Sequence, residues 1–130
     1  MLLGERDELL RKLTELSRES EAFSPDSSTE SLKNLEHWYF ELLEGAGFHS
    51  IGTDEETFER ATAMYFGEVL VRNVPAFKWF VTEFAFERGR YEIGVRRPLL
   101  DLMLYRLAPA PRERNRREQS IWRRYQQASR

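Results

Sequence analysis

Residues 77–97 read FKWFVTEFAFERGRYEIGVRR, and this stretch decides the fold class. Its side chains alternate between two faces on both sides of residues 87–90, which is the period-two pattern of β-strands. Gly89 can adopt the positive φ that a tight turn requires, so the stretch is predicted to form a β-hairpin. Because a two-stranded hairpin is only marginally stable by itself, helices, a further strand or another chain must cover it.

Two helices are predicted in the first 45 residues. The first covers residues 5–20, where leucines form a narrow stripe, and Pro25 disfavours helical geometry in the residue before it. Ser27 and Glu30 have the spacing of a capping box, so the second helix is expected to start near Ser28. Its many leucines and aromatic residues cover more than one face, which predicts a deeply buried helix.

A third helix is predicted from about Asp54 to Asn73. Thr53 and Glu56 repeat the capping-box spacing at its start. Ala63 and Gly67 lie four residues apart and form a notch of small side chains. Since a glycine inside a helix costs about 1 kcal/mol relative to alanine, we expect another element to approach the backbone closely at this notch.

The composition is that of one folded domain. The chain has 130 residues, of which 13% are aromatic, and this apolar content excludes a disordered chain. The core is expected to come mainly from the second and third helices and the hairpin. These core residues are Trp38, Tyr39, Leu42, Phe58, Tyr65, Val69, Trp79, Val81, Tyr91 and Ile93.

The apolar run at residues 99–107 is ambiguous by its period alone. Pro98 can occupy the first turn of a helix, and the run is rich in Leu and Met and lacks β-branched residues. These features favour a helix, and a third strand is the alternative. In either case the chain is an α+β protein, with N-terminal helices packed on a small antiparallel sheet or hairpin.

The sequence divides into a single α+β domain over residues 1–107 and a C-terminal arm over residues 108–130. The arm begins with the stiff spacer Ala-Pro-Ala-Pro and continues as a basic helix. Residues 1–60 carry a net charge of about −9 and residues 106–130 about +6, counting Lys and Arg against Asp and Glu. We therefore expect the arm to dock on the acidic half, within one chain or in a swapped homodimer.

Several classes of function are excluded or disfavoured. The absence of cysteine removes disulfides, thiolate metal sites and cysteine nucleophiles. No membrane-spanning apolar run and no signal-peptide pattern is present, so a cytoplasmic protein is expected. His37 and Glu41 lie four residues apart but give too few ligands for a metal. With no phosphate-binding loop or catalytic triad pattern, we expect neither an enzyme nor a cofactor.

Two groups of residues are candidates for binding. Glu68 lies on a helix that should be largely buried, where a carboxylate can act as a general acid or base, and an ion pair with Arg72 is the competing interpretation. The arm supplies the second group, which is Arg116, Arg117, Trp122, Arg123, Arg124 and Tyr125. Cations interleaved with aromatic residues can bind phosphates and bases, but the net charge of −2 argues against a nucleic-acid partner.

Residues 58–107 resemble bacterial domains of unknown function. The resemblance rests on Tyr65-Phe66-Gly67-Glu68-Val69-Leu70, on Trp79 at the start of a strand, and on a closing segment that contains Pro98, Met103, Arg106 and Leu107. Such domains resemble small immunity or partner-binding proteins in size and layout, and the resemblance implies no catalytic residue. The leading hypothesis is a non-enzymatic protein-interaction domain. The alternatives are a toxin-neutralising immunity protein and a small enzyme built around Glu68.

Overall fold

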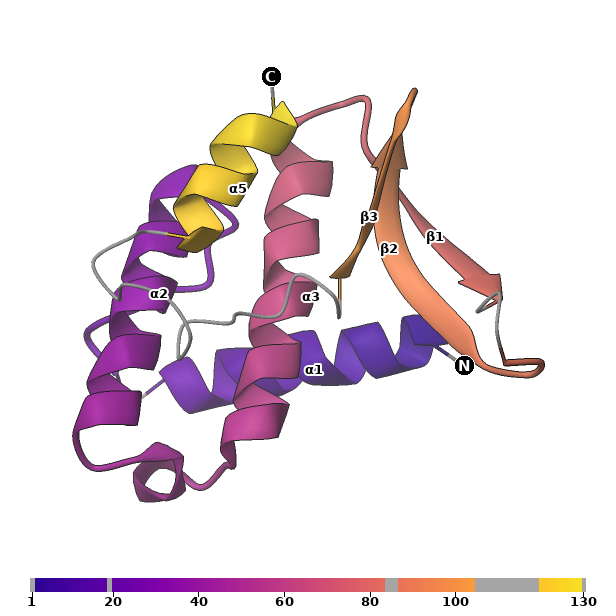
Figure 1. Cartoon of the computed structure of the whole chain (residues 1–130). Coiled ribbons are helices and arrows are strands. Elements are labelled where there is room, and N and C mark those ends of the chain that lie inside the picture. The colour runs from indigo at the N-terminus through magenta and orange to yellow at the C-terminus, as the bar shows by residue number, and fades with distance from the viewer. Residues whose placement is uncertain (1, 19, 84–86, 105–119, 130) are drawn as a thin grey trace.

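The computed structural model describes residues 2–18, 20–83, 87–104 and 120–129. In this part of the chain, helices and one small antiparallel sheet form an α+β fold (Figure 1). The elements, in chain order, are α1 (Leu2–Ser17), α2 (Thr29–Glu44), the 3₁₀ helix η1 (Phe48–Ile51), α3 (Glu55–Asn73), β1 (Lys78–Glu83), β2 (Tyr91–Arg97), β3 (Leu100–Met103) and α5 (Ser120–Ser129). The predicted fold class is confirmed.

Helix α3 lies at the centre of the molecule. The sheet packs on one side of it, α2 and α5 pack on the other, and α1 crosses both α3 and β2 (Figure 1). Residues 61–67 of α3 are all buried, because the helix has neighbours on every side over this stretch. This explains why a narrow hydrophobic stripe is missing from the sequence of α3.

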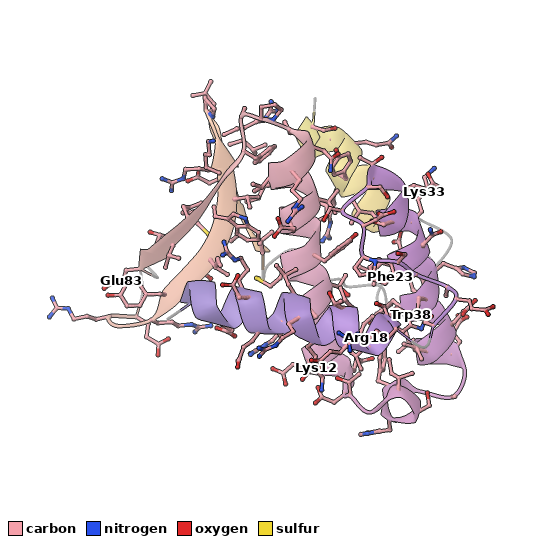
Figure 2. All side chains as sticks on the ribbon, turned by 180° about the vertical axis from the view of Figure 1, so that it is seen from behind. Lys12, Arg18, Phe23, Lys33, Trp38 and Glu83 are labelled. Carbon is pink, nitrogen blue, oxygen red and sulfur yellow. The ribbon has the colours of Figure 1, made fainter. Side chains whose placement is uncertain are left out.

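Aromatic side chains fill the space between α2 and the segment that precedes it. Phe23 stacks on Trp38 with 5.8 Å between ring centroids, and Figure 2 shows the two side chains close together beside α2. The edge of Phe23 also meets Tyr65, at 5.2 Å, and Trp38 meets Phe58 at the same distance. Such offset and edge-on contacts are the favoured geometries for aromatic pairs.

Helix α2 starts where predicted, but with a different cap. The Ser28 side chain, and not that of Ser27, accepts a hydrogen bond from Ser31 N at 3.2 Å. Ser27 has a φ of 63°, whereas an N-cap needs the extended backbone that Ser28 adopts. Asp26 Oδ1 in turn accepts a hydrogen bond from Ser28 N, and hydrogen bonds from Ser28 lower the pKa of the Asp26 carboxyl.

Helix α3 starts within one residue of its predicted position but with a different cap, and α1 lies three residues earlier than predicted. Asp54 caps α3 by accepting a hydrogen bond from Thr57 N at 2.7 Å, which lowers the pKa of its carboxyl. Thr53, the predicted cap, is buried against η1, where its N–H bonds to Phe48 O. Helix α1 ends at Ser17 rather than at residue 20.

The helix favoured at residues 99–107 is wrong over its first part, because residues 100–103 form the third strand. Strand β3 pairs with β2, with Leu102 opposite Val95 and Met103 opposite Gly94. Pairing with β1 on one side and β3 on the other makes β2 the central strand. In a hairpin alone, the backbone N–H and C=O groups on this edge of β2 would be unpaired. Strand β3 provides their hydrogen-bond partners. Residues 105–107 lie outside the described part.

The predicted core is correct for α2, α3 and Ile93 but wrong for Val81 and Tyr91, which are 41% and 53% exposed. Both point toward the core side of the sheet. Val81 lies on an edge strand, however, and Tyr91 lies near the hairpin tip, which extends past α3 (Figure 1). Trp79 is half-buried and packs against the core.

Helix α5 docks on α2 and α3 within one chain (Figure 1). Among the side chains described on α5, Tyr125 and Ala128 are buried, so the arm contributes directly to the core. Tyr125, one of the candidate binding residues of the arm, is therefore a core residue. The spacer and residues 112–119 lie outside the described part, and the division at residue 107 and a swapped homodimer stay predictions. None of the helices described is both long and apolar enough to cross a bilayer.

Candidate interaction surface

Glu68 and Arg72 form the ion pair that was the competing interpretation. Arg72 Nε donates to Glu68 Oε1 at 2.8 Å, and this contact raises the pKa of Arg72. Glu68 is 19% exposed and Arg72 65%, so the pair lies at the surface of α3. Because Arg72 lies one helical turn from Glu68, it can pair with the carboxylate without a further group. This geometry favours a structural role for Glu68.

Tyr65, three residues before Glu68 on α3, takes part in a chain of buried hydrogen bonds that the sequence did not predict. Its hydroxyl accepts from Ser27 N at 2.9 Å and lies 2.6 Å from Ser31 Oγ. Because Ser31 Oγ donates its one proton to Ser28 O, the Tyr65 hydroxyl donates to Ser31. Asn73 Nδ2 also donates to Ser27 O, at 2.8 Å. The third helix thereby fixes the turn that starts α2.

His37 and two acidic residues of α3 also have partners within the chain. His37 Nε2 lies 2.7 Å from Glu41 Oε1 on the exposed side of α2. Glu59 accepts a hydrogen bond from Tyr39 at 2.7 Å, and Glu56 pairs with Arg60. No group of three or more potential metal-binding side chains occurs among the described residues.

The structure separates the two groups of predicted binding residues. On α3, Glu68 lies about 200° and Arg72 about 240° around the helix axis from Phe66, at 100° per residue. Arg124 of α5 lines a cleft beside Phe66. Tyr125 points into the core. Arg116 and Arg117, and the side chains of Trp122 and Arg123, lie outside the described part.

The cleft lies between α3, β3 and α5 and has a volume of about 350 Å³. Its apolar lining comes from Phe66, Leu100, Leu102 and Ala128, and Arg124 and Gln127 complete it. Leu100 and Leu102 are half-buried and share the face of β3 that packs on the core. An apolar opening of this size accommodates a large aliphatic or aromatic side chain.

Leu99 projects beside this cleft from the turn between β2 and β3. Arg97 pairs with Leu100, so the turn consists of Pro98 and Leu99 alone. Leu99 has a φ of 69° and is fully exposed, with a relative accessibility of 107%. A positive φ at the second turn position normally belongs to glycine or asparagine, because a Cβ atom is unfavourable there.

Arg97 is a neighbour of the cleft, although it is not one of its lining residues. It lies directly opposite Leu100 on β3, and cross-strand neighbours have Cβ atoms about 5 Å apart. Its guanidinium lies 5.7 Å from the ring centroid of Phe77. Its Nε atom is buried, and no hydrogen-bond acceptor among the described residues reaches it.

We call this region the Leu99 surface, comprising Arg97, Leu99, Phe66, Leu100, Leu102 and Ala128. None of these six residues is predicted from the sequence to bind a partner. A usable signal exists at Pro98-Leu99-Leu100, because the third-strand alternative places a leucine at a turn position that prefers glycine. The other lining residues come from three elements far apart in the sequence, and only the tertiary structure brings them together.

Comparisons with known proteins identify a family but no characterised relative. No curated protein matches the chain, and no solved structure matches it. The match to a protein family covers residues 3–129, which includes the helices, the sheet and α5. The chain therefore belongs to the family described as uncharacterised protein YwmA.

Proposed function

We propose that the protein is a non-enzymatic interaction domain that binds a protein partner through the Leu99 surface. The observation that carries this proposal is the state of Leu99, which combines full exposure with a positive φ. Neither property helps the isolated chain to fold. A left-handed backbone costs a leucine about 1–2 kcal/mol, and a large apolar side chain in water gains nothing from the fold.

The fold itself does not need a leucine at position 99. Glycine or asparagine would satisfy the turn with less strain, and either would remove an apolar side chain from water. Strained residues that the surrounding structure holds in place are concentrated at binding and active sites. The neighbouring apolar cleft supplies a second contact for the same partner, since exposed apolar patches mark interaction sites.

A toxin-neutralising immunity protein is an alternative interaction protein that would use a different surface. The carboxylates of Glu8, Glu15, Glu30, Glu41 and Glu44 are exposed on α1 and α2, within the acidic half of the chain. They would favour a basic partner and increase its association rate at low salt. The enzyme alternative loses support, because Arg72 already pairs with Glu68.

Site-specific photo-crosslinking tests the use of the Leu99 surface. A photoreactive residue is placed at position 99 in one protein and at Arg88, an exposed residue of the hairpin tip, in the control. We expect a discrete adduct with a lysate protein from position 99 only. Excess wild-type protein should compete for it, and excess Leu99→Asn protein should not. Equal adducts from both positions, or none from position 99, would contradict the proposal.

A further inference from the structure

We infer that the partner segment presents an apolar side chain next to a carboxylate, with the apolar group in the cleft and the carboxylate on Arg97. This inference rests on the proposed function and specifies the chemistry of the partner. Its starting point is the difference between Arg96 and Arg97, which are adjacent on β2 and point to opposite faces of the sheet.

The Arg96 guanidinium has two partners among the described residues. It lies 3.7 Å from the ring centroid of Phe80, and its Nε lies 3.4 Å from Asp101 Oδ1. On the core-facing side of the sheet, Arg97 contacts the face of Phe77 and forms no ion pair with a described carboxylate. A half-buried guanidinium without an anionic partner is a ready site for a carboxylate.

The register of the sheet places this cation next to the apolar cleft. Arg97 and Leu100 are opposite one another on the same face, and Leu100 lines the cleft. A side chain seated against Leu100 and Phe66 would therefore bring its neighbouring residues close to the guanidinium. Arg124 lines the same cleft and adds a second cation to its wall.

The charge of the chain agrees with an acidic partner segment. Residues 61–130 carry about +7 against about −9 for residues 1–60, counting Lys and Arg against Asp and Glu. The cleft is built entirely from this basic half. A basic segment would meet like charge at Arg97, and a purely apolar one would leave Arg97 without a counter-ion.

Selection from a displayed library of random twelve-residue peptides tests the inference. On the wild-type protein we expect enrichment of sequences with Leu, Ile, Met or Phe within two positions of Asp or Glu. Synthetic copies of these peptides should bind at least about tenfold more weakly to Arg97→Gln, the loss of one charge-assisted hydrogen bond. Arg96→Gln is the matched control and should bind within about twofold of the wild type, since Arg96 faces away from the cleft.

The possible failures are distinguishable. Enriched peptides without carboxylates that still lose binding in Leu99→Asn would overturn the inference and leave the proposed function intact. If the wild type and Leu99→Asn select the same peptides, both the inference and the proposed function are contradicted. Sedimentation velocity provides the third outcome. A wild-type dimer that becomes a monomer in Leu99→Asn would show that a second copy covers the surface, and would overturn the inferred partner.

Discussion

The ring of Trp79 lies directly over the backbone of Gly67. A Cβ atom on Gly67 would stand 2.8 Å from Trp79 Cη2 and 2.7 Å from Leu104 Cδ1, closer than real Cβ contacts allow. The predicted notch on the third helix therefore exists, and β1 occupies it. This contact is the reason that α3 tolerates a glycine in its interior.

Replacing Gly67 with leucine should reduce the free energy of unfolding by about 1–3 kcal/mol or more, because the rigid indole must move. Urea denaturation followed by circular dichroism measures the loss. Gly4→Leu is the matched control, since a Cβ on this helical glycine meets nothing within 4 Å. A Gly67→Leu protein as stable as Gly4→Leu would show that the sheet does not approach α3 at this point.

Tyr65→Phe should lower the free energy of unfolding by about 1–3 kcal/mol at neutral pH, because Ser27 N loses its acceptor in a buried site. Tyr91→Phe, a change on an exposed tyrosine, should alter it by less than about 0.5 kcal/mol. Chemical denaturation of the two variants in parallel provides the measurement. Equal effects would contradict the hydrogen-bond chain.

The same tyrosine should make stability depend on alkaline pH. Burial raises the pKa of the Tyr65 phenol above its ordinary value of 10.0, and burial also raises the pKa of Tyr125. The unfolded phenols ionise first, so their contribution is complete below pH 10 and is lost as the pH rises through the folded pKa values. Tyr65→Phe should reduce the loss of stability at alkaline pH. An unchanged pH profile would contradict a contribution from the Tyr65 phenol.

Leu99→Asn should raise the free energy of unfolding by about 0.5–1.5 kcal/mol, because asparagine tolerates a positive φ better than leucine. Leu100→Asn, at the next position, should lower it because Leu100 packs against the core. Thermal unfolding of both variants is the test. A destabilised Leu99→Asn would mean that the fold itself uses this leucine, which would remove the main support for the interaction surface.

Tyr125→Ala should cost about 2–4 kcal/mol, since the side chain is buried between α5 and the helices beneath it. Gln126→Ala, a change at the exposed adjacent residue, should be close to neutral. The measurement is urea denaturation together with limited proteolysis of the C-terminus. Equal stabilities of the two variants would show that α5 is not docked in solution.

Residues 65–70 contain features that local sequence patterns predict and features that they do not. The motif over this segment stays a prediction, and the notch at Gly67 could be inferred from the rarity of glycine inside helices. The hydrogen bonds of Tyr65 could not, because Ser27 lies 38 residues away and acquires its conformation from the tertiary contact. The motif residues Tyr65, Gly67 and Glu68 all have structural partners in the fold.

The sequence by itself determined the helices, the hairpin and the position of the turn at Gly89, because periodicity and turn chemistry act over a few residues. Tertiary structure decided the rest. Residues 100–103 became a strand because β2 offered an unpaired edge, and the apolar pattern alone was compatible with either state. The cleft beside Leu99 exists only because residues 66, 100, 102 and 128 converge from α3, β3 and α5. No local pattern encodes such proximity, since it depends on how the separate apolar faces pack together.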